Sequence, residues 1–64
     1  MDNAEKMARI IEENWRSART RDTWFQIRSW IHGAYLIESD PEISEYLVTL
    51  YEVAKAHQKD ADRV

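Results

Sequence analysis

The chain has 64 residues, which allows one domain at most and only a small core. It contains no cysteine, so disulfides and thiolate metal sites are excluded, and stability has to come from efficient helix packing or self-association. The formal net charge of −3, from 9 Lys+Arg against 12 Asp+Glu, argues mildly against a dedicated nucleic-acid binder, whose surface is normally basic.

The spacing of apolar residues is helical along the chain and nowhere alternates as in a strand. We therefore expect an all-α fold, a small three-helix bundle with helices at about 3–18, 22–38 and 40–60. The links are short, which favours antiparallel neighbours in an up-down-up order. The alternative is a helical hairpin that completes its core as a dimer. Residues 1–64 form a single helical domain in this interpretation, with a polar C-terminal tail that frays from about residue 59.

The first predicted helix has one apolar stripe, with spacings of three and four residues. The second predicted helix is apolar on two sides, since each residue turns the helix by about 100°. Its main stripe is expected to enter the core. The predicted core residues of these two helices are Ala4, Met7, Ala8, Ile11, Trp15 and Ala18, then Trp24, Ile27, Ile31, Ala34 and Tyr35.

A second strip lies nearly opposite the main stripe of the second helix. It consists of Phe25, Ser29, Gly33 and Leu36, while Trp30 and Ile37 widen the main stripe on one side. Gly inside a helix costs about 1 kcal/mol relative to Ala, and close approach of another backbone is one reason to tolerate it. Two alternatives stay open. Gly33 can end the helix as a C-cap, which would dissolve the strip, or both strips can be covered within the monomer.

The third predicted helix has the clearest start in the chain. Asp40 is the expected N-cap, with Pro41 at the first helical position, where its missing N–H costs nothing. The alternative is a capping box formed by Ser39 and Glu42. The apolar seam then follows spacings of four and three, with His57 expected to lie half-buried near its end. The seam residues are Ile43, Leu47, Leu50, Ala54, His57 and Ala61.

Motifs that carry chemistry are missing from the sequence. No serine lies in a nucleophile-elbow motif, and the lone Gly cannot build a phosphate-binding loop. His57 and Asp60 are three residues apart, but a closed metal site needs about four ligands. We therefore expect no enzyme activity, no cofactor, no metal and no small-molecule substrate.

The function expected from these features is a small non-enzymatic protein-interaction module, that is, a regulator, an inhibitor or an adaptor. Small size without catalytic motifs also suits proteins encoded by phages or mobile elements. The partner is a protein, and a homodimer is the first candidate because two-fold dimers are the commonest oligomers. The predicted contact residues are Phe25, Ser29, Gly33 and Leu36, with Trp30 and Ile37.

Two further functions remain as alternatives. Four arginines cluster around the first link beside aromatic residues, and such groups can bind phosphates and stack on bases. The residues of this alternative nucleic-acid contact are Arg16, Arg19, Arg21 and Arg28. The chain can also be a subunit of a larger assembly. No segment reaches the roughly 18 apolar residues of a membrane span, and no secretory signal precedes the first helix, so we expect a cytoplasmic protein without membrane contact.

Overall fold

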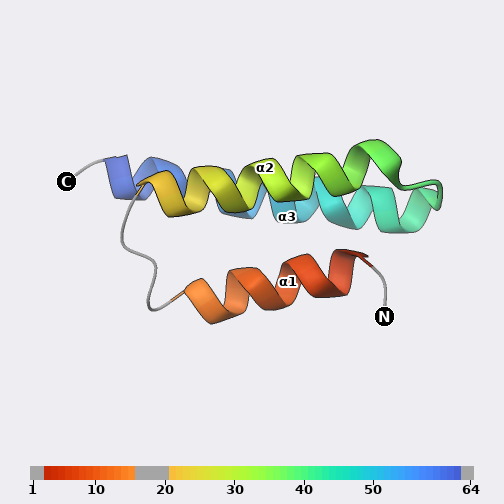
Figure 1. The fold of residues 1–64 in the computed structure, drawn as a ribbon, viewed down its shortest axis with the longest axis horizontal. Coiled ribbons are helices and arrows are strands. Elements are labelled where there is room, and N and C mark those ends of the chain that lie inside the picture. The colour runs from red at the N-terminus through yellow and green to blue at the C-terminus, as the bar shows by residue number, and fades with distance from the viewer. Residues whose placement is uncertain (1–2, 16–20, 63–64) are drawn as a thin grey trace.

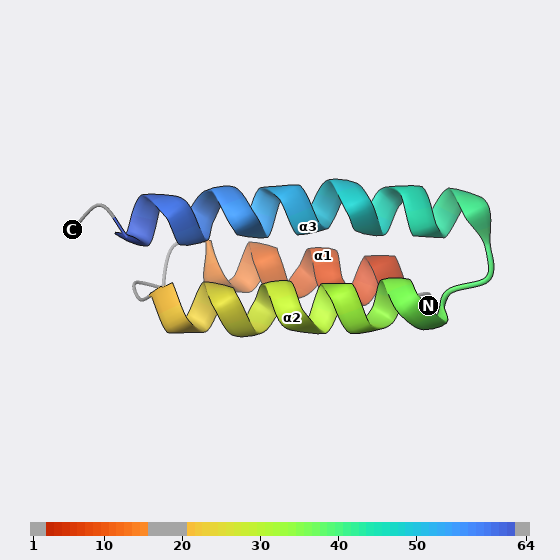
Figure 2. The ribbon, with the colours of Figure 1, turned by 90° about the horizontal axis from the view of Figure 1, so that it is seen from above.

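A computed structural model describes residues 3–15 and 21–62, which contain three α-helices. They are α1 (Asn3–Asn14), α2 (Arg21–Ile37) and α3 (Pro41–Asp62). Helices α2 and α3 run side by side and antiparallel, and α1 packs along one face of this hairpin (Figures 1 and 2). The predicted all-α, up-down-up three-helix bundle is confirmed. The alternative of a helical hairpin is not observed, because α1 contacts both other helices.

Helix α1 is shorter than the range expected from the sequence. It ends at Asn14, whose side-chain amide donates a hydrogen bond of 2.8 Å to the carbonyl of Ile10. The N–H of Trp15 then bonds the carbonyl of Glu12 at 3.3 Å, the tighter spacing typical of a last helical turn. The expected continuation to Ala18 lies outside the described residues.

The turn between α2 and α3 is built from side chains that accept backbone hydrogen bonds. One carboxylate oxygen of Asp40 accepts from the N–H of Glu42 at 2.9 Å and from that of Ile43 at 3.4 Å. The carboxylate of Glu38 accepts from the N–H groups of Ser39 and Asp40. Asp40 is therefore the N-cap of α3, as predicted, and the alternative capping box is not used.

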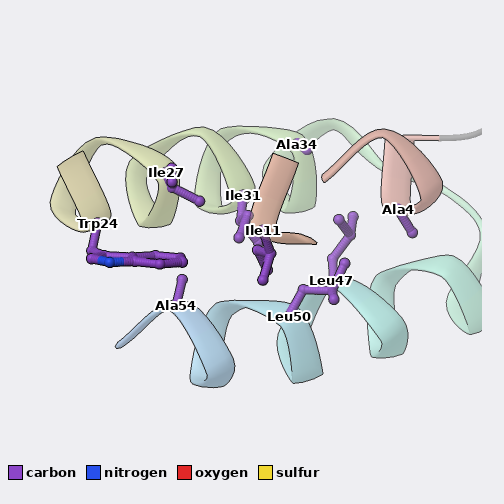
Figure 3. Packing of buried hydrophobic residues seen from close by; sticks show 9 residues of the cluster. All are labelled: Ala4, Ile11, Trp24, Ile27, Ile31, Ala34, Leu47, Leu50 and Ala54. Carbon is purple, nitrogen blue, oxygen red and sulfur yellow. The ribbon is translucent and has the colours of Figure 1, made fainter. Parts of the chain in front are cut away.

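The core lies between the three helices, and each of them contributes to it (Figure 3). The largest fully buried side chains are those of Ile27, Ile31 and Leu47. Partly buried residues such as Met7 and Ile43 surround this centre. The buried apolar set is Ala4, Ile11, Trp24, Ile27, Ile31, Ala34, Leu47, Leu50 and Ala54.

Two residues that the sequence placed in the core are exposed instead. Trp15 follows the end of α1, so the helical stripe no longer directs its side chain inward; its ring contacts His57 by an edge. Tyr35 lies on the flank of α2 that borders α3 and lines an open cleft there. Both predictions were wrong because a helical wheel does not show where a helix ends or how closely its neighbour approaches.

Candidate interaction surface

Gly33 lies inside α2. The helix continues to Ile37, and the N–H of Glu38 still bonds the carbonyl of Tyr35 at 3.3 Å. No described glycine has a positive φ, so Gly33 does not have the left-handed conformation of a C-cap. The second strip of α2 therefore exists as a helical surface.

The side chains of this surface are open to solvent in the single chain. Exposed fractions are 51% for Phe25, 48% for Trp30, 67% for Leu36 and 78% for Ile37. Ser29 and Gly33 are also exposed. The alternative in which both strips are covered within the monomer is therefore wrong. We call these six residues the α2 face.

The structure divides the α2 face between two flanks of the helix. Trp30, Gly33 and Ile37 border an open groove between α1 and α2, with a volume of about 540 Å³. Ser29, Ala34, Lys6, Met7 and Ile10 complete its lining. Phe25 is on the other flank, where its ring lies beside the guanidinium of Arg28. The six predicted residues thus do not form one flat strip. Helix α1 contributes to the groove side of the α2 face.

The opposite flank of α2 borders α3 and holds a smaller, mostly apolar cleft of about 170 Å³. Tyr35 and Val48 reach solvent at this cleft, with exposed fractions of 42% and 45%. The predicted interaction residues did not include it. Val48 is an apolar residue outside the predicted seam of α3. Its position in the sequence was therefore the one indication of an additional apolar surface on this helix. The lining residues are Ile31, His32, Tyr35, Leu47, Val48 and Tyr51.

Of the four arginines of the nucleic-acid alternative, the structure describes Arg21 and Arg28. The guanidinium of Arg28 donates a hydrogen bond of 2.9 Å to Gln58 Oε1 and lies 5.5 Å and 5.4 Å from the ring centroids of Phe25 and Tyr51. Arg21 is exposed at the first residue of α2, and the predicted contacts Arg16 and Arg19 lie outside the described residues. Arg28 is engaged in contacts within the bundle.

Charge is distributed unevenly along the molecule. The end formed by the α2–α3 turn is acidic, because residues 29–54 contain no Lys or Arg while Glu38, Asp40, Glu42 and Glu45 lie near that turn. The other end of the hairpin has mixed charge: Arg21, Lys55 and Lys59 alternate with carboxylates. The α2–α3 hairpin therefore has an acidic turn and an opposite end of mixed charge, while Lys6 of α1 lines the same groove as Ile37.

Within residues 3–15 and 21–62, no group of three or more metal-binding side chains comes together. None of the three helices there is both long and apolar enough to cross a lipid bilayer. Comparison of the chain with protein-family models, with curated proteins and with solved structures finds no match in any of the three.

Proposed function

We propose that this chain is a small non-enzymatic interaction protein that acts as a regulator, inhibitor or adaptor and associates with a second copy of itself through the α2 face. The observation that carries the proposal is the exposure of Phe25, Trp30, Leu36 and Ile37 on one 17-residue helix. Large exposed apolar surface rimmed by polar residues marks interaction sites in soluble proteins, and Trp30 and Ile37 border one groove here.

Free energy supports a partner for this face. Complete burial of a large apolar side chain stabilises by roughly 1.5–3 kcal/mol, and these four side chains realise only part of that in the single chain. A domain of about 60 residues buries only about 60% of its unfolded surface, so association is a common additional source of stability. A second copy is the simplest partner because it carries the same apolar face.

Sedimentation equilibrium over a wide range of dilution tests the proposal. We expect the wild-type mass to rise with concentration, and we expect Trp30→Asp or Leu36→Asp to shift that rise to at least tenfold higher concentration. Thr49→Asp, at an exposed position of α3, is the matched control for an added carboxylate. A wild-type chain that stays monomeric throughout would overturn self-association. Trp30→Asp and Leu36→Asp proteins that both associate as the wild type does would overturn the α2 face as its site.

The two alternatives predict different results. Nucleic-acid binding through the arginines would show as an affinity for duplex DNA that falls steeply with salt. A subunit that folds fully only on its assembly would show weak helicity and a broad thermal transition when isolated. We expect neither result, because Arg28 is held by Gln58 and all three helices share one buried core.

A further inference from the structure

One row of α2 residues has the spacing of a helix–helix seam. Gln26, Trp30, Gly33 and Ile37 follow one another at four, three and four residues, and all four are exposed. At about 100° per residue they lie within about 60° of one another on the helix surface. The last three border the groove between α1 and α2. We call this row the α2 seam.

The α2 seam is complementary to itself when reversed. Gln26 and Ile37 lie equally far from the midpoint between Ile31 and His32, and so do Trp30 and Gly33. An antiparallel pair of α2 helices around a two-fold axis at that midpoint would place each Trp30 against the partner's Gly33. The largest side chain of the seam would then meet the smallest, which is the complementarity that a two-fold interface requires.

Gly33 provides the space for such a contact. A Cβ atom at this position would meet no described atom within 4 Å, so nothing within the described bundle requires a glycine there. In the single chain Gly33 only weakens the helix, by about 1 kcal/mol relative to Ala. Close approach of an indole ring from a second copy would explain physically why position 33 is a glycine.

The charges disfavour a parallel pair. A parallel pair would bring the two acidic turns, with Glu38, Asp40 and Glu42, together. Like charges brought together across an interface are unfavourable. An antiparallel pair separates the two acidic turns by the length of α2, so the antiparallel orientation avoids this repulsion.

A standard interface would need only a small part of the surface of this chain. A standard interface buries about 800 Å² on each partner, and the accessible surface of this chain is 4750 Å². About one sixth of the surface is therefore needed. The side of the bundle formed by α1 and α2 runs along the longest axis of the molecule, which is 37 Å (Figure 1). Trp30 and Ile37 line the groove on this side.

We propose that two copies of the chain pair antiparallel along the α2 seam, with Trp30 of each copy packed over the partner's Gly33. This inference rests on the proposed self-association and adds its orientation and register. The seam position of Gln26, which was not among the predicted contact residues, faces the partner's Ile37.

Disulfide trapping tests the register directly, because the natural chain contains no cysteine. Gln26→Cys and Ile37→Cys proteins are mixed, allowed to equilibrate, oxidised under mild conditions and analysed by intact mass. The proposed register brings position 26 of one copy to position 37 of the other. Two copies of the same position are separated by 11 residues, about 16 Å along the helix, and a disulfide needs Cα atoms within about 7 Å.

We expect the mixed 26–37 disulfide to exceed either homodisulfide at least tenfold, whereas random coupling gives only a twofold excess. Val48→Cys, exposed on α3, is the control and should couple poorly to both. Homodisulfides that equal or exceed the mixed product, or no disulfide at all, would overturn the register. Sedimentation of the reduced proteins distinguishes a wrong register from a wrong proposed function. Reduced proteins that associate but give the wrong disulfides would overturn only the register, whereas reduced proteins that stay monomeric would overturn self-association itself.

A second variant tests the space over Gly33. Gly33→Leu fills it with a side chain that the single chain accommodates in open solvent, so the helix content should be retained. We expect the dimer dissociation constant to rise at least tenfold. An unchanged dissociation constant in a folded Gly33→Leu protein would overturn the contact between Trp30 and the partner's Gly33.

Discussion

The imidazole of His57 stacks on the indole of Trp24, with ring centroids 4.3 Å apart and planes inclined by only 13°. The ring of Trp15 meets the same imidazole by an edge, at 4.4 Å and 76°. His57 thus joins α3 to α2 and to the residue that follows α1. The half-buried position expected for His57 from the sequence is confirmed, and the two ring contacts supply its role.

His57→Ala should lower the free energy of unfolding by about 1–2 kcal/mol, because each ring pair contributes roughly 0.5–1.5 kcal/mol beyond its buried area. Urea denaturation followed by far-UV circular dichroism measures this without depending on tryptophan emission. His32→Ala is the control, since His32 is exposed and its ring is 6.2 Å from that of Tyr51. Equal losses in both variants would contradict a special role for His57.

Arg28 and Gln58 should show an asymmetric response to substitution. Gln58 is buried and its Oε1 accepts from Arg28, so Arg28→Met leaves that oxygen without this donor and should cost about 1–3 kcal/mol. Replacing both residues by Met removes the demand for a hydrogen bond. We therefore expect the double variant to be more stable than Arg28→Met alone in urea denaturation. If the loss in the double variant equals the sum of the losses in Arg28→Met and Gln58→Met, the hydrogen bond contributes nothing to stability.

Asp40→Ala should destabilise the chain by about 0.5–2 kcal/mol, since the side chain that caps α3 is lost and the N–H of Glu42 loses its acceptor. Thermal melting monitored by circular dichroism measures the change. Ser39→Ala, one residue earlier in the same turn, is the control and should have little effect. A larger loss in the Ser39 variant would instead support the capping box with Glu42.

Gly33→Ala should stabilise the single chain by up to about 1 kcal/mol, because Ala is the better helix former and its Cβ would meet no described atom within 4 Å. The measurement is urea denaturation at concentrations too low for association. Ser29→Ala, one turn earlier on the same face, provides a comparison, since its hydroxyl bonds only the carbonyl of Phe25. A loss of stability in Gly33→Ala would mean that something in the folded chain contacts this position closely.

Features that depend on neighbours in the chain could be predicted from the sequence alone. The helical spacing predicted three helices and the buried row of Trp24, Ile27 and Ile31, because a side chain's direction around a helix is fixed by its residue number. The pair Asp40–Pro41 predicted the start of α3, because capping involves atoms only two or three residues away.

Features that depend on how the helices meet could not be predicted from local patterns in the sequence. Arg28 and Gln58 are 30 residues apart, so no local pattern indicates their bond. The α2 face is divided because α1 packs against one flank of α2 and α3 against the other, which a single helical wheel cannot show. Gly33 was ambiguous in the sequence because Gly suits both a helix end and a crowded helix surface. The backbone hydrogen bonds beyond it keep α2 intact to Ile37 and leave Gly33 as open surface.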